Sequence, residues 1–149
     1  MFVRLMTVYD VDRVYDIVCR SFDEYYEKEV LLFLIGRWPS GQLVAVDATG
    51  YLAGFLSGSR LTRDKAGISL FAVDETYRGR GIGSRLLDEF RLRTLMDGKQ
   101  YIQLEVRDTN TDGISFYRNR GFAATEYAKG FYNNGGNAVK MVCSVQRNS

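Results

Sequence analysis

Apolar positions in this chain switch between a helical and an extended spacing, and the switches mark the predicted elements. After Thr7-x-x-Asp10, a capping box, apolar residues recur every three or four positions from Val11 to Phe22, which predicts an amphipathic helix. Strict alternation over 101–107 predicts a half-buried strand. The same reasoning predicts helices over 27–37, 82–96 and 112–120, and strands over 2–6, 42–46, 51–57, 67–73, 122–129 and 138–145.

The order of these elements is β-α-α-β-β-β-α-β-α-β-β. It predicts an α/β (α+β) fold with a mixed, mostly antiparallel central sheet of about seven strands and helices on both faces. At 149 residues and 46% hydrophobic content, the chain is expected to be a single domain over residues 1–149. We expect strand 138–145 to be an exposed edge that could mediate a dimer, so both a monomer and a homodimer stay open.

Charge and hydropathy argue against two classes of partner. The net charge of +2 is too small to indicate nucleic acid, and the arginines of segment 78–93 share a helix with acidic residues, which favours a solvated helical face. The longest apolar run, 30–35, is too short to span a bilayer, and no secretory signal pattern opens the chain. We therefore expect a cytoplasmic protein without a membrane partner.

The chain has two cysteines and no histidine. Cys19 and Cys143 are not in a C-x-x-C pattern, so neither a metal site nor a disulfide is predicted, and we expect both thiols to be reduced and buried. Without histidine, a general base must be a carboxylate, a tyrosine, a lysine or a relayed water.

A glycine-rich turn joins strand 67–73 to the helix over 82–96, with the sequence Arg78-Gly79-Arg80-Gly81-Ile82-Gly83-Ser84. Unpaired backbone N–H groups and the helix dipole make such a turn a binding site for an anion, here a phosphate-bearing cofactor. The turn lacks the Lys-Ser/Thr of a P-loop, and its glycines do not fit the dinucleotide fingerprint.

The turn resembles the cofactor loop of the GNAT superfamily of N-acetyltransferases, whose pattern Q/R-x-x-G-x-G/A is matched by Arg78, Gly81 and Gly83. The order of elements is also that of the GNAT fold. The resemblance extends to Leu104-Glu105-Val106-Arg107-x-x-Asn110, Ile114-x-x-Tyr117 and Gly121-Phe122. These motifs look most similar to the branch of ribosomal-protein alanine N-acetyltransferases and archaeal N-terminal acetyltransferases.

The resemblance implies acetyl-CoA as co-substrate and no metal. Matched by position, it implies that the pantetheine arm lies along the backbone of Phe71, Ala72 and Val73 and contacts Asn110, and that the pyrophosphate is held by Arg78, Gly79, Arg80, Gly81, Ile82, Gly83 and Ser84. It also implies two catalytic residues, Glu105 as the base and Tyr117 as the acid that protonates the departing thiolate, close to the cofactor's sulfur.

The chemistry needs these residue types. An ammonium must lose a proton before it attacks a thioester, and a partly desolvated carboxylate such as Glu105 accepts it directly or through water. Taken alone, a strand glutamate is commonly a solvated face residue, a helix tyrosine commonly packs, and Asn110 could be only a helix cap. Covalent transfer through Cys19 or Cys143 is disfavoured, because neither has an activating neighbour in sequence.

Acceptor binding depends on the segment between the first two helices and on the last hairpin. Phe131-Tyr132 resembles the tyrosine pair of N-terminal acetyltransferases, and Asp23-Glu24-Tyr25-Tyr26 could supply charge and aromatic contacts. The candidates are Glu24, Tyr25 and Tyr132, although a solvated loop is an equal alternative for 23–26. Asn137 replaces the usual acidic residue, and Asn133-Asn134-Gly135-Gly136 replaces a more acidic turn.

The sequence therefore predicts an acetyl-CoA-dependent N-acetyltransferase that works by direct transfer in a ternary complex. The expected acceptor is the α-amine of a protein or peptide N-terminus, a ribosomal protein being one candidate. Lysine side chains and small amines stay open. From other classes, we keep a noncatalytic acyl-CoA-binding module, and a basic RNA-associated domain that would bind with steep salt dependence.

Overall fold

The computed structural model describes residues 1–146, with seven strands and four α-helices over this range. In chain order these are β1 (Phe2–Leu5), α1 (Val11–Ser21), α2 (Glu29–Arg37), β2 (Gln42–Val46), β3 (Leu52–Arg60), β4 (Lys65–Val73), α3 (Ile82–Met96), β5 (Tyr101–Arg107), α4 (Thr111–Arg118), β6 (Ala123–Ala128) and β7 (Ala138–Ser144). The predicted order of elements is confirmed, and α3 and β5 have the predicted bounds.

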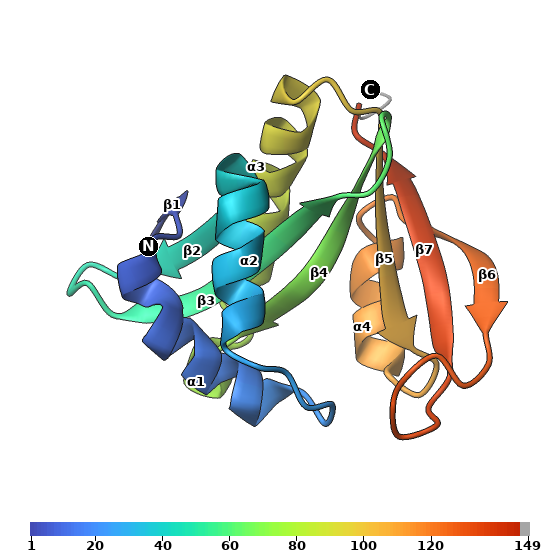
Figure 1. Cartoon of the computed structure of the whole chain (residues 1–149), viewed down its shortest axis with the longest axis horizontal. Helices are drawn as coiled ribbons and strands as arrows, with labels where there is room; N and C mark the ends of the chain where they lie inside the picture. Colours follow the sequence, from blue (N-terminus) through green and yellow to red (C-terminus); the bar gives the residue numbers. More distant parts are fainter. Residues whose placement is uncertain (147–149) are drawn as a thin grey trace.

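The sheet has the strand order β1-β2-β3-β4-β5-β7-β6, and every neighbouring pair is antiparallel except β4 and β5. The parallel pair is joined only where Lys65–Gly67 meets Tyr101–Gln103. Beyond this short ladder, the two strands diverge and separate the sheet into two halves (Figure 1). The predicted mixed, mostly antiparallel sheet is therefore confirmed, with one interruption.

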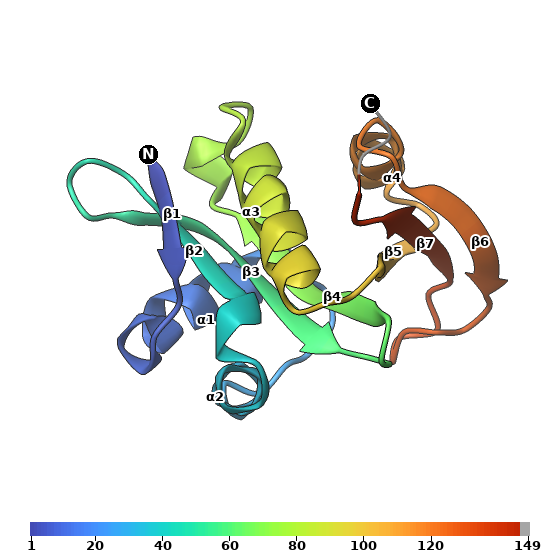
Figure 2. The same ribbon diagram turned by 90° about the horizontal axis from the view of Figure 1, so that it is seen from above.

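Helices cover both faces of the sheet, as predicted. α1 and α2 lie on one face of the N-terminal half, and α3 and α4 lie on the opposite face (Figure 2). The core has two parts. One packs α3 residues such as Leu86 and Phe90 against the sheet, and the other packs α1 and α2 through Val14, Val18 and Leu31. Among residues 1–146, no helix has the length and apolarity that a membrane crossing requires.

The capping box predicted before α1 is present. The Thr7 hydroxyl accepts from the Tyr9 N–H at 3.3 Å, and Asp10 accepts from the Thr7 N–H at 2.8 Å. A short 3-10 turn over Val8–Asp10 precedes the α-helix. Asp10 also receives both terminal nitrogens of Arg4 from β1, so the start of α1 is tied to the edge of the sheet.

The expectation that strand 138–145 forms an exposed edge is wrong. β7 lies between β5 and β6 and pairs with both, so the edge strand in this half is β6. The reason is that β6 folds back onto β7 as a hairpin and covers the edge that β7 would otherwise expose, and Ala138, Met141 and Cys143 are buried accordingly. β6 is exposed along most of its length and carries a register irregularity between Ala124 and Glu126, a feature that disfavours pairing with another edge.

Two further expectations need correction. Arg91 is not on a solvated face, because it is 7% exposed and donates to the carbonyl oxygens of Ser144, at 3.0 Å, and Arg120. It thus joins α3 to the C-terminal half beyond the divergence of β4 and β5. Cys143 is buried as expected, but Cys19 is exposed, since it lies on the outward side of α1.

Candidate active site

A cavity of about 930 Å³ occupies the space where β4 and β5 diverge. Its walls come from β4, β5, the N-terminal part of α3 and α4, the α1–α2 loop and the β6–β7 loop. Most of the predicted site residues line it, namely Phe71, Ala72, Val73, Arg78, Gly83, Glu105, Asn110, Tyr117, Glu24 and Tyr132. Gly79, Arg80, Gly81, Ile82, Ser84 and Tyr25 are not among the lining residues.

The backbone of β4 presents polar groups to this cavity. The Asp74 N–H donates to the Ala53 carbonyl of β3 at 2.7 Å. Because N–H directions alternate along a strand, the N–H groups of Val73 and Phe71 point the other way, toward β5. β5 does not pair with this part of β4, so these groups are available to an extended ligand.

The glycine-rich turn has the backbone of an anion site. Gly79 and Gly81 have φ values of +78° and +77°, a left-handed conformation that favours glycine. Gly81 is the N-cap of α3 and provides no side-chain cap. The first N–H groups of α3 therefore have no partner within the helix, and the helix dipole adds positive potential at the same point.

The side chains of the turn point in different directions. Arg78 lines the cavity and donates to the Val73 carbonyl at 3.2 Å. Ile82 is buried in the core, and Arg80 stacks on the Tyr77 ring at 5.0 Å beside a second, smaller cavity. The Ser84 hydroxyl accepts from Nε of Arg120 at 3.0 Å. Of the seven residues, therefore, Arg78 and Gly83 line the main cavity.

A stack of aromatic and charged groups supports the start of the turn. The Tyr77 ring stacks on Tyr51 at 5.5 Å, and its hydroxyl donates to Asp47 at 2.5 Å. Hydrogen bonds from Thr49 and then Tyr77 hold the pKa of Asp47 well below its usual range. Asp74 receives Arg13 at 2.5 Å, and this guanidinium is the main cause of the lowered pKa of Asp74.

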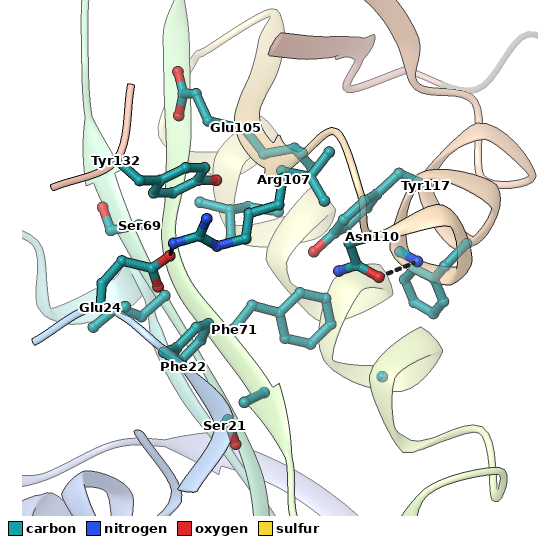
Figure 3. A pocket seen from close by; sticks show the side chains of 18 of the residues that line it. Ser21, Phe22, Glu24, Ser69, Phe71, Glu105, Arg107, Asn110, Tyr117 and Tyr132 are labelled. Atoms are coloured by element: carbon teal, nitrogen blue, oxygen red, sulfur yellow. Dashed lines mark hydrogen bonds and ion pairs between the residues drawn. The ribbon is translucent and has the colours of Figure 1, made fainter. Parts of the chain in front are cut away.

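Asn110 lies at the junction of β5 and α4. Its side-chain oxygen accepts from the Gly113 N–H at 2.9 Å and caps α4. The side-chain nitrogen points into the cavity (Figure 3). The capping role and a contact with a ligand are therefore compatible at this position.

Tyr117 projects from α4 into the middle of the cavity. Its ring packs against Phe71, Phe116 and Phe122, with ring centres 6.3, 5.3 and 5.5 Å away. The hydroxyl faces the hollow next to Asn110 (Figure 3). Burial, with a smaller effect from Tyr132, raises the pKa of Tyr117 well above its usual range. The phenol is therefore protonated at neutral pH and can act as a proton donor.

Glu105 lies farther from this centre. Its carboxylate accepts from Gln103 at 2.9 Å, and its partner in the β5–β7 register is Lys140. In Figure 3, the Glu105 carboxylate lies on the side of Tyr132 and away from the Tyr117 hydroxyl. A proton path from the cavity centre to Glu105 therefore needs a water.

The part of the cavity lined by β5, the α1–α2 loop and the β6–β7 loop contains an ion pair. Arg107 of β5 donates to Glu24 of the α1–α2 loop, and the two side chains are 22% and 8% exposed. The guanidinium also lies 4.2 Å from the centre of the Tyr132 ring and donates to Asn134 at 3.0 Å. Burial first, and the charge of Glu24 second, raise the pKa of Tyr132 to about 12.

Sequence reasoning missed two parts of this wall. Arg107 was recognised only as part of a motif, although strand alternation puts it on the same side of β5 as Glu105. Tyr25 was predicted to line the site, but it is 76% exposed, and the lining residue is its neighbour Tyr26. A loop without periodicity does not reveal which of two adjacent tyrosines faces inward.

The cysteines do not contribute to the cavity. Neither Cys19 nor Cys143 is among its lining residues, so no cysteine thiol of residues 1–146 is placed to carry an acyl group there. Within the same range, histidine, cysteine and acidic side chains form no group of three or more that could hold a metal ion.

A sheet divided at one parallel pair, a glycine-rich helix N-terminus at the divergence and a phenol between them define an acetyltransferase of the GNAT fold. Residues 11–122 match the Acetyltransferase (GNAT) family. The chain belongs to this family, as its motifs indicated, and the expectation of an acyltransferase enzyme is confirmed.

Individual relatives agree in sequence and in fold. The crystal structure of Ard1 from Thermoplasma volcanium is 36% identical, with a TM-score of 0.93 over 98% of each chain. N-alpha-acetyltransferase 30 of Schizosaccharomyces pombe is 27% identical over 133 residues, covering 85% of this chain and 86% of the relative. The NatC complex bound to Gag peptide and CoA shares the fold, at 21% identity and a TM-score of 0.89 over 97% and 98% of the chains.

Proposed function

We propose that this chain, as a single domain over residues 1–149, transfers the acetyl group of acetyl-CoA to the N-terminal α-amine of a protein or peptide. The observation that carries the proposal is one continuous cavity that joins an anion-binding helix N-terminus, a buried phenol and an acidic wall. Relatives named for N-α-acetyl transfer support the choice of acceptor.

The cofactor end of the cavity suits acetyl-CoA. The free N–H groups at the start of α3, the backbone of residues 79–84 and the Arg78 guanidinium would hold the pyrophosphate. The N–H groups of Phe71 and Val73 and the Asn110 side-chain amide would pair with the amide groups of the pantetheine arm. In this arrangement the thioester lies next to Tyr117.

The acceptor end suits an ammonium group. Asp23, Glu24 and Glu105 line it, with Tyr132 as an aromatic wall. Glu24 would hold the ammonium, and Tyr132 would contact the first residue. Tyr25 is excluded from this role by its outward position.

Transfer then takes place directly between the two bound substrates. Glu105 takes a proton from the ammonium through a water, and the free amine attacks the thioester carbonyl carbon. The Val73 N–H stabilises the oxyanion of the tetrahedral intermediate. When the C–S bond breaks, Tyr117 gives its proton to the thiolate, and the phenolate takes back, through water, the second proton that the attacking nitrogen loses, so that free coenzyme A and a neutral amide leave.

The proposal is tested by measuring coenzyme A release with three matched acceptors. One peptide has a free N-terminus and no lysine, a second has a blocked N-terminus and one lysine, and the third acceptor is a polyamine. We expect release with the first acceptor only. Release with only the second or third would move the assignment to lysine or small amines, and acetyl-CoA binding without release would indicate a noncatalytic role.

A further inference from the structure

Residues from two separate loops hold the Arg107 side chain of β5 inside the acceptor end of the cavity. Glu24 comes from the α1–α2 loop, while Tyr132 and Asn134 come from the β6–β7 loop (Figure 3). Both hydrogen bonds use Nη2, one nitrogen of a guanidinium that carries five N–H donors in a planar fork. Arg107 therefore closes the contact between two loops that would flank an acceptor.

The β6–β7 loop is shaped to receive this guanidinium. The Asn134 side-chain oxygen accepts from both Nη2 of Arg107, at 3.0 Å, and the Gly136 N–H, at 3.1 Å. A Cβ atom at Gly136 would collide with Nη1 of Arg107, so a larger residue there would displace this guanidinium. The turn Asn133-Asn134-Gly135-Gly136, which stands where a more acidic turn is usual, thus binds the guanidinium cation of Arg107.

This arrangement affects which acceptors can bind, an inference that rests on the proposed function. The ammonium needs Glu24, and Glu24 already pairs with Arg107. When an ammonium binds the same carboxylate, two cations share the single negative charge of Glu24, and Arg107 is mostly shielded from water, so the shared pairing is energetically costly. The acceptor recovers that cost if it brings a carboxylate of its own to Arg107.

We propose that Arg107 is a specificity-determining residue that selects acceptors with an acidic side chain close to the α-amine. Such an acceptor exchanges one ion pair for two, its ammonium on Glu24 and its carboxylate on Arg107. With a neutral side chain, Arg107 and the ammonium share the one charge of Glu24, and a basic side chain adds repulsion. Glu105 does not cancel the effect, because its carboxylate accepts from Gln103 and it is opposite Lys140 in the β5–β7 register.

The test compares three peptides that differ only in Glu, Gln or Lys at position 2, and a second set that differs at position 1. Affinity for the protein saturated with coenzyme A is measured by calorimetry at low salt, and kcat/KM for acetyl transfer is measured in parallel. We expect the order Glu, Gln, Lys in at least one set, with about tenfold between steps, typical of a well-placed charge pair.

Variants at Arg107 show whether the preference among the peptides depends on this residue. Arg107→Gln should bring the ratio of Glu to Gln peptides close to one, whereas Arg107→Lys should keep part of the preference, since it keeps the charge without the planar fork. Equal values for all three peptides in both sets, or a ratio unchanged in Arg107→Gln, would overturn the inference alone. Failure of acetyl transfer to every peptide would count against the proposed function instead.

Discussion

The side-chain oxygen of Asn110 accepts a hydrogen bond from the Gly113 N–H at 2.9 Å, and the same side chain turns its nitrogen toward the cavity (Figure 3). One asparagine therefore begins the helix that carries Tyr117 and offers a donor to a ligand. The two roles use different atoms, so they can be separated by substitution.

Asn110→Ala should lower both stability and acetyl-CoA affinity, because it removes the cap, at a cost of about 1 kcal/mol, and the donor. Asn110→Asp keeps an acceptor for the Gly113 N–H and loses only the donor. It should keep the melting temperature within a few degrees and weaken acetyl-CoA binding. Equal acetyl-CoA affinity in Asn110→Asp and the native protein, by calorimetry, would remove Asn110 from the cofactor site.

Tyr117→Phe should lower kcat about 100-fold, at the lower end of the range for general acid catalysis, while KM for acetyl-CoA changes little. The ring packing against Phe71, Phe116 and Phe122 is kept, so the fold is preserved. Steady-state kinetics with a saturating acceptor measure the effect. Tyr127→Phe is the control, because this exposed tyrosine of β6 lies outside the cavity lining. A full native kcat in Tyr117→Phe would exclude the phenol as the acid.

Glu105→Gln and Glu24→Gln should change different kinetic constants. If Glu105 is the base, its loss lowers kcat with little change in the KM of the acceptor. If Glu24 holds the ammonium, its loss raises that KM and leaves a half-buried Arg107 without its carboxylate partner, so the melting temperature also falls. Initial rates over a range of peptide concentrations separate the two cases. The opposite pattern would exchange the two assignments.

Gly81→Ala should destabilise the protein by about 1 to 2 kcal/mol, because alanine does not readily adopt the φ of +77° at this N-cap. Space is not the cause, since a Cβ there meets nothing within 4 Å. Gly36→Ala in α2 is the matched control. A Cβ atom at Gly36 also meets nothing within 4 Å, but this glycine lies in a helix, so alanine should stabilise the protein by about 0.5 to 1 kcal/mol. Urea unfolding measures both changes. If Gly81→Ala does not lower the free energy of unfolding, the left-handed φ of Gly81 is not a constraint on this residue.

Stability should fall in acid. Hydrogen bonds and ion pairs lower the pKa of Asp47 and Asp74 in the folded protein, so the unfolded chain binds more protons as the pH drops. The stabilisation is complete above the ordinary aspartate pKa of about 3.9 and is lost progressively as the pH falls toward the lower folded-state values. The melting temperature at pH 7 and pH 3 measures the loss. Asp74→Asn should show a smaller difference between the two values than the native protein, and an equal difference would contradict this assignment.

Much of the fold was predictable because its signals are local. The capping box at Thr7, the alternation over 101–107 and the glycine-rich turn before α3 each specify an element from its own residues. The position of β7 between β5 and β6 is not local, because it depends on which strand the last hairpin meets after a loop of nine residues, 129–137. The same holds for Arg91, whose acceptors are far away in sequence.

The site was predictable where a motif coincides with an element end, as at Arg78 and Asn110. The acceptor wall was not, since Glu24, Arg107 and Asn134 come from three segments that meet only in the folded chain. The cytoplasmic location and a ribosomal-protein acceptor stay predictions.

Transfer to the N-terminal α-amine is best measured by mass spectrometry of a peptide library after incubation with the protein and acetyl-CoA, each peptide having a free N-terminus and one internal lysine. Mapping of the acetyl group separates the two amines within one molecule. We expect acetylation of N-termini, in a subset of sequences enriched in acidic residues at the first two positions. Acetyl groups confined to lysine, or no transfer despite bound acetyl-CoA, would contradict it.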